Sequence, residues 1–97
     1  MRKNVQAIAD AFMSGSARTE SRMFTTGDVV YSYDMPIAQR VSGEIEIIAR
    51  SQGPSMTTKT HIAGLVTAMM YAKQPFKTVQ VLTGFQPHTF RRQIGAR

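Results

Sequence analysis

The chain has 97 residues, no cysteine and a formal net charge of +6, and 42% of its residues are hydrophobic. This length supports one small domain, and the apolar fraction is sufficient for a folded core. The lack of cysteine excludes a disulfide framework and a thiolate metal site. That lack also fits a reducing compartment, so we expect a cytoplasmic location. No apolar run approaches the length that crosses a membrane, so we expect no membrane association.

Charge is divided unevenly along the chain. All six acidic residues lie within the first 46 positions, together with five bases, whereas the following 51 positions carry seven bases and no acid. Uncompensated positive charge favours contact with a polyanion or with an acidic protein surface. The C-terminal half is therefore the expected binding half.

The first predicted element is a short amphipathic helix within residues 1–15. Four apolar residues repeat at helical spacing: Val5, Ile8, Ala9 and Phe12. Asn4 is the expected N-cap, and Gly15 is placed to end the helix. Residues 14–21 are small and polar, which predicts a linker before the next element.

A β-meander is predicted next. Four short β-prone runs occur at residues 22–25, 29–33, 37–41 and 44–48, with turn residues at 26–28, 34–36 and 42–43 between them. In the last run, Ile45 and Ile47 alternate with Glu44, Glu46 and Ile48, which predicts a strand with one buried and one wet face.

One main helix and a last strand complete the predicted fold. Ser55, Thr57 or Thr58 is expected to cap the helix, whose apolar stripe is Ile62, Leu65, Val66 and Met69, and Pro75 to end it. Residues 77–82 have the composition of a strand. The predicted class is α+β: a short helix, a meander of three to four strands, one helix on the sheet and a possible last strand. The αβ core spans residues 22–82, and residues 83–97 form a partly mobile basic tail of the single domain.

The middle of the chain resembles a known group of proteins. The similarity rests on the Tyr31-x-Tyr33 strand, Pro36-Ile37-Ala38, the strand with Ile45 and Ile47, and Ser55-x-Thr57-Thr58-x-x-His61-Ile62. This succession, over roughly residues 25–65, resembles small uncharacterised proteins encoded by bacteriophages. Asp34-Met35 stands where that pattern often has Gly or Asn. The resemblance implies a phage accessory protein that acts in the bacterial host cytoplasm, and it implies no particular activity.

Two features of the core region have alternative interpretations. The hydroxyls before the main helix can simply cap it, or the helix N-terminus and Lys59 can receive a phosphate, because free N–H groups and the helix dipole favour an anion there. Tyr31 and Tyr33 are predicted to share one face of their strand. They either pack against a helix or present a stacking platform for bases.

The basic C-terminal half supplies the main candidate site. It combines bases and aromatic residues: Lys73, Lys77, Phe90, Arg91, Arg92 and Arg97. Lysine and arginine side chains release counterions from a phosphate backbone, and aromatic rings stack on unpaired nucleobases. The first hypothesis is therefore electrostatic nucleic-acid binding. The alternative is a solvated basic tail.

The second hypothesis is a host-directed inhibitor or adaptor that binds an acidic bacterial protein through an exposed strand edge, Met70 or the tail. A homodimer formed by strand pairing also stays open. No catalytic motif occurs, and His61 and His88 lack a carboxylate at metal-ligand spacing, so we expect no enzyme activity, no metal and no cofactor.

Overall fold

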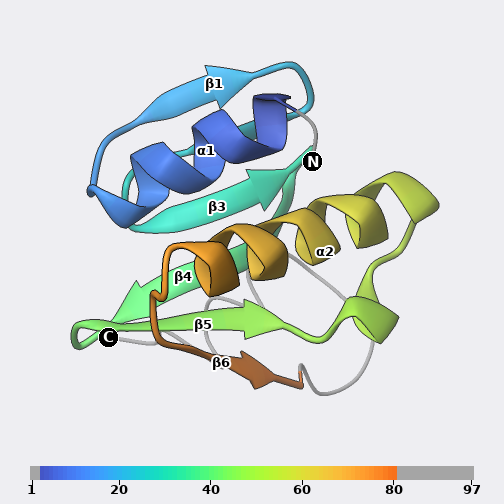
Figure 1. Ribbon diagram of the computed structural model, residues 1–97. Coiled ribbons are helices and arrows are strands. Elements are labelled where there is room, and N and C mark those ends of the chain that lie inside the picture. Colours follow the sequence, from blue (N-terminus) through green and yellow to red (C-terminus); the bar gives the residue numbers. More distant parts are fainter. Residues whose placement is uncertain (1–2, 81–97) are drawn as a thin grey trace.

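The computed structural model describes residues 3–80 and has an α+β fold (Figure 1). Two helices lie on one face of a six-stranded sheet, whose strands are arranged in chain order. The elements are α1 (Lys3–Met13), β1 (Arg18–Glu20), β2 (Met23–Thr25), β3 (Val29–Ser32), β4 (Met35–Val41), β5 (Glu44–Ile48), the 3₁₀ helix η1 (Arg50–Gln52), α2 (Met56–Tyr71) and β6 (Phe76–Val79). Strand β6 runs parallel to β5, because α2 connects them as a crossover, and the other pairs are antiparallel.

Helix α1 ends as the sequence predicts. Gly15 has a φ of +77°, and the N–H groups of Gly15 and Ser16 donate to the carbonyls of Phe12 and Ala11, the pattern of a Schellman motif. The expected cap at the other end is wrong, because α1 already includes Lys3. Asn4 lies inside the helix, where its side-chain oxygen accepts from the N–H of Val5 at 2.9 Å.

The predicted linker contains a strand. Within residues 14–21, β1 pairs with β2 in an antiparallel register, so the sheet has more strands than expected. The strand was missed because β1 lies at the sheet edge and its residues, Arg18, Thr19 and Glu20, are polar and largely exposed, without the apolar alternation of a half-buried strand.

The turn between β3 and β4 differs from the prediction. Met35 and Pro36 belong to β4, and the turn consists of Tyr33 and Asp34, with Tyr33 at a φ of +57°. The β3–β4 register shifts between Val30 and Tyr31, which is the signature of a bulge. The turn at Ser42 and Gly43 is confirmed, with both residues at positive φ.

Helix α2 begins where the sequence predicts. Ser55 is the N-cap, and its hydroxyl accepts from the N–H of Thr58 at 3.1 Å. The helix stops at Tyr71, before Pro75, because Lys73 adopts a left-handed φ of +55°. The N–H groups of Lys73 and Gln74 then donate to the carbonyls of Met70 and Met69, which satisfies the last turn.

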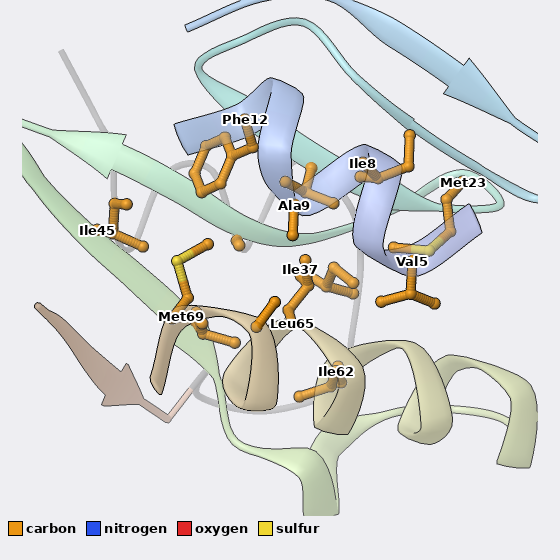
Figure 2. Packing of buried hydrophobic residues seen from close by; sticks show 14 of the residues in the cluster. Val5, Ile8, Ala9, Phe12, Met23, Ile37, Ile45, Ile62, Leu65 and Met69 are labelled. Carbon is orange, nitrogen blue, oxygen red and sulfur yellow. The ribbon is translucent and has the colours of Figure 1, made fainter. Parts of the chain in front are cut away.

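The core lies between the two helices and the sheet (Figure 2). Its labelled members come from α1 (Val5, Ile8, Ala9, Phe12), from the sheet (Met23, Ile37, Ile45) and from α2 (Ile62, Leu65, Met69). The N-terminal helix therefore packs on the sheet of its own chain. The predicted α2 stripe is confirmed, except that Val66 is only partly buried.

Strand β5 is more buried than its alternation predicts. Ile45 and Ile47 point into the core, but Glu46 is only 8% exposed and Ile48 is fully buried. The expected wet face is wrong at these two positions: Ile48 belongs to the core cluster, and Glu46 lies between Gln39 of β4 and Lys77 of β6, its register partners.

Arg40 connects α1 to the turn between β2 and β3. Its guanidinium donates to the carbonyls of Gly27 and Phe12 and lies 4.9 Å from the centroid of the Phe12 ring. This satisfies a carbonyl in the last turn of α1 with a cation, the charge that a helix C-terminus favours. Among residues 3–80, neither helix is long and apolar enough to cross a membrane.

Candidate nucleic-acid interface

Lys59 lies in the first turn of α2, directly behind the capping residue. Its side chain is half-buried, and a Cβ added to Gly53 would lie 2.8 Å from its Cγ, so its stem packs against that loop. Ser55 caps the N–H of Thr58, as the simpler interpretation of the hydroxyls predicts. The Ser55 hydroxyl is therefore the cap, the Thr58 hydroxyl contacts Ser55 and Ser32, and Lys59 adds a positive charge to this end of the helix.

Arg50 is a second basic residue near this end of α2, and no sequence motif singles it out. It lies in η1, which packs on α2, and it is exposed. Its side chain also lines the groove between α2 and β6, next to Ile62 and Ala63. Only the structure brings Arg50 and Lys59 to one region, since nine positions separate them in the sequence.

Lys73 lies at the opposite end of α2. It is exposed and occupies the left-handed position after the helix. Fourteen residues at 1.5 Å per residue place it about 21 Å from Lys59 along the helix. The two predicted lysines therefore do not form one compact patch.

Lys77 is ion-paired. Its Nζ lies 3.3 Å from Glu46 Oε2 and 3.5 Å from Glu44 Oε1. The hydrogen bond with Glu46, followed by that with Glu44 and their negative charges, raises the pKa of Lys77. The sequence suggested that the second half carries no compensating acid, but the fold brings two acids from β5 to this lysine.

The two tyrosines do not share a face, so that prediction is wrong. Tyr31 stacks on Phe24 of β2, with ring centroids 4.4 Å apart and planes inclined by 10°. Tyr33 lies in the turn after β3, is 46% exposed and is tilted towards His61 at 6.5 Å. The left-handed φ of Tyr33 breaks the strand alternation on which the prediction depended.

Tyr31 lies on the sheet face opposite the helices. Its register partners are Phe24 on β2 and Pro36 on β4, whereas the neighbouring Ser32 points to the helix side, where it contacts Thr58. Tyr31 and Phe24 are each partly exposed. Their stack is therefore a small aromatic surface on the helix-free face.

His61 belongs to a buried polar cluster below the start of α2. Its Nδ1 lies 2.7 Å from Ser32 Oγ, which in turn lies 3.1 Å from Thr58 Oγ1. A serine and a histidine at this distance are the components of an activated nucleophile. Here they are 0% and 2% exposed, so the contact joins the sheet to α2 instead of facing a substrate.

The remaining basic residues of the described range fall into two groups, those with an ion pair and those without one. Arg18 pairs with Glu20 at 2.6 Å and Arg40 with Asp28 at 3.6 Å. Within residues 3–80, four basic side chains are described without an ion pair: Arg22, Arg50, Lys59 and Lys73. Phe90, Arg91, Arg92 and Arg97 lie outside the described residues.

No family model matches the chain, and neither a curated protein nor a solved structure does. The resemblance to bacteriophage proteins therefore stays a prediction. Within the described part of the chain, no three His, Cys, Asp or Glu side chains are grouped so that they could hold a metal ion. The candidate binding features of the described residues are therefore the basic side chains without an ion pair and the stack of Tyr31 on Phe24.

Proposed function

We propose that this protein binds nucleic acid, mainly by electrostatic attraction. The observation that carries the proposal is the position of the net charge. Residues 3–80 contain eight bases and six acids and contribute +2, whereas Arg2 and the arginines after residue 80 contribute the other +4. Three of these four, Arg91, Arg92 and Arg97, have no acid near them in the sequence, and arginines that contact a phosphate backbone release counterions from it.

The basic side chains without an ion pair in residues 3–80 extend the proposed contact with phosphates. Arg50 and Lys59 lie near one end of α2 and Lys73 near the other, about 21 Å away along the helix. One strand of B-DNA carries a phosphate about every 3.4 Å, so this distance corresponds to roughly six phosphates. Basic side chains spaced in this way suit contact with a nucleic-acid backbone and give no pattern that would recognise particular nucleobases.

The Tyr31–Phe24 stack is the one described feature that suits contact with unpaired nucleobases. Aromatic rings on a sheet face bind single strands by stacking, which tolerates any base. The proposal therefore includes a preference for single-stranded over double-stranded nucleic acid of equal length.

The test measures the affinity of the full chain for labelled single- and double-stranded oligonucleotides over a series of salt concentrations. Affinity should fall steeply as salt rises, and replacing Arg91 and Arg92 together by Ala should reduce the salt slope by about 2, one for each lost phosphate contact. Lys77→Ala is the matched control, because Lys77 is already paired with Glu44 and Glu46. An affinity that does not respond to salt would refute the proposal.

Origin and location belong to the same proposal. The resemblance over residues 25–65 supports a phage accessory protein that acts in the bacterial host cytoplasm without catalysis or a cofactor. Such a protein meets host and phage nucleic acid directly.

A host-directed inhibitor or adaptor is the second candidate. The observation that favours it is the exposure of Met70 (66%) and Tyr71 (84%) at the end of α2, since exposed large apolar side chains suit a protein partner. Co-purification from nuclease-treated and untreated bacterial lysate separates the two. A stoichiometric host protein that survives nuclease favours the adaptor, and recovery that depends on nucleic acid favours the first function.

A further inference from the structure

Helix α2 carries a second apolar strip on the side that faces away from the core. Its residues follow each other at intervals of four, three, four and three positions and define the outer seam: Met56, Thr60, Ala63, Thr67 and Met70. All are at least partly exposed, with Met56 at 72% and Met70 at 66%. An average interval of 3.5 residues is the repeat by which one helix packs along another.

The two threonines make the outer seam more apolar than their composition suggests. The hydroxyl of Thr60 donates to the carbonyl of Met56 at 3.0 Å, and that of Thr67 donates to the carbonyl of Ala63 at 2.9 Å. Because both hydroxyls are bonded within the helix, a partner surface would not need to satisfy them. Their methyl groups are then available for packing.

Charge is nearly absent from α2. Lys59 is the only Lys, Arg, Asp or Glu in its sixteen residues, and the inner side with Ile62, Leu65 and Met69 is already buried. A helix that is apolar on both sides is typical of one that is covered on both sides. The described elements cover only the inner side of α2.

We infer that a second copy of this chain covers the outer seam, with the two α2 helices antiparallel across a two-fold axis at Ala63. Met56 and Met70 lie seven positions before and after Ala63, and Thr60 and Thr67 lie three before and four after it. Antiparallel pairing therefore brings methionine onto methionine and leaves each threonine one position away from a threonine of the second copy. A two-fold interface requires such self-complementarity, and the small Ala63 lets the helix axes approach closely.

The adjoining groove extends the contact surface. It is a hollow of about 340 Å³ between α2 and β6, and seven residues of the described range line it: Ile62, Ala63, Val66 and Thr67 on the helix, Ile48 and Thr78 on the strands, and Arg50 in η1. Sixteen helical residues span about 24 Å, and a helix with its side chains is about 10–12 Å across, so the helix alone offers roughly 250–300 Å² on each copy. The groove adds to this area, and the total for two copies falls in the range of small protein interfaces, below about 1,200 Å².

Electrostatics also favours this face for self-association. Each chain carries a net charge of +6, so two copies repel each other unless they meet where charge is lowest. The outer seam contains no charged residue, and Arg50 is the one described charged residue that lines the adjoining groove. Because added salt screens this repulsion, the dimer should be retained or strengthened as salt rises. That response is opposite to the one expected for nucleic-acid binding.

The first test uses a single engineered thiol. The chain has no cysteine, so Ala63→Cys introduces a unique thiol at the proposed two-fold axis. Mild oxidation should convert most of this variant to a disulfide-linked dimer, because only close Cα atoms can be bridged. Thr19→Cys, an exposed position on β1, is the matched control and should stay largely monomeric. Equal cross-linking of both variants would overturn the inference.

The direction of the pairing has its own readout. Met56→Cys and Met70→Cys should form a mixed disulfide when combined and little disulfide when oxidised separately, because antiparallel helices place residue 56 opposite residue 70 of the second copy. Efficient cross-linking of each variant with itself would overturn the antiparallel arrangement.

The second test is sedimentation velocity of the nuclease-treated full chain over a range of concentrations and at high salt. Met70→Glu should raise the dimer dissociation constant at least tenfold, whereas Thr19→Glu, with the same charge change on β1, should leave it within about twofold. A chain that stays monomeric at every concentration, or equal effects of both variants, overturns the inference. If a host protein occupies the outer seam instead, the purified chain will be monomeric and Met70→Glu will abolish that complex.

Discussion

Ser32 Oγ and His61 Nδ1 lie 2.7 Å apart in the interior, where they join β3 to α2 across 29 positions of sequence. Thr58 adds a second contact to Ser32 at 3.1 Å, and Ser55 links the cluster to the helix cap. A polar cluster that is buried and hydrogen-bonded fixes the position of the helix start on the sheet, because each group needs its partner.

Replacement of Ser32 by Ala should destabilise the protein by about 1–3 kcal/mol. It removes the Ser32 hydroxyl, so the buried side chains of Thr58 and His61 each lose a hydrogen-bond partner. Urea unfolding followed by circular dichroism measures this loss. Ser51→Ala, an exposed serine in η1, is the control and should change the free energy of unfolding by less than about 0.5 kcal/mol. Equal stability of the two variants would contradict the structural role.

The sequence predicts those elements whose signals are local. The Ser55 cap, the turn at Ser42 and Gly43, and the end of α1 at Gly15 each depend on a few neighbouring residues, and all are confirmed. Strand β1 has no such signal, because an exposed edge strand has no apolar alternation. The parallel pairing of β6 with β5 depends on the path of α2 across the sheet, which no local pattern contains.

Close contact between α1 and α2 depends on Gly64. A Cβ at this position would lie 2.6 Å from Val5 Cγ1, closer than atoms can approach. Gly64→Ala should therefore destabilise the protein by about 1–3 kcal/mol, although a helix interior normally gains about 1 kcal/mol from this change. Thermal unfolding of Gly64→Ala, Val5→Ala and the double variant checks the mechanism.

The double variant provides the control for this prediction. If the clash is the cause, Gly64→Ala should cost less in the presence of Val5→Ala than in the native chain, since the smaller side chain leaves room for the added methyl group. Strictly additive effects, or a stabilised Gly64→Ala protein, would show that the helices do not pack this closely.

Lys73 occupies a backbone position that glycine prefers. Its φ of +55° ends α2, and the left-handed region is unfavourable for a residue with a Cβ. Lys73→Gly should stabilise the protein by about 0.5–1 kcal/mol, whereas Lys73→Ala removes the same charge, keeps the strain and should not stabilise it. Denaturant unfolding distinguishes them, and equal stabilities would contradict the strained conformation. Both variants should weaken nucleic-acid binding to the same degree, because both remove the lysine charge.

The candidate site was predicted less completely than the fold. Composition located the excess of bases, but it could not show that Lys77 meets Glu44 and Glu46, because that contact depends on β6 lying beside β5. The apolar outer seam of α2 was also missed. Its signal, Met56 and Met70 placed symmetrically about Ala63, is present in the sequence but is hidden there by the stronger inner stripe.

Lys77 predicts a stability change at alkaline pH. Glu46, then Glu44, hold its pKa above the ordinary value of 10.5, so the folded state binds this proton more tightly than the unfolded chain does. The stabilisation is complete at pH values below the ordinary lysine pKa and is lost as the pH rises through the higher pKa of the folded state. Lys77→Met should therefore lower stability at neutral pH and flatten its decline at alkaline pH, as measured by the denaturation midpoint at each pH.

Lys73→Met is the control, because Lys73 has no ion pair within residues 3–80. If Lys73→Met gave an alkaline profile as flat as that of Lys77→Met, the assignment to Lys77 would be refuted. Since Glu46 is largely buried and its Oε1 has no hydrogen-bond partner, Lys77 supplies the one described charge that compensates this carboxylate.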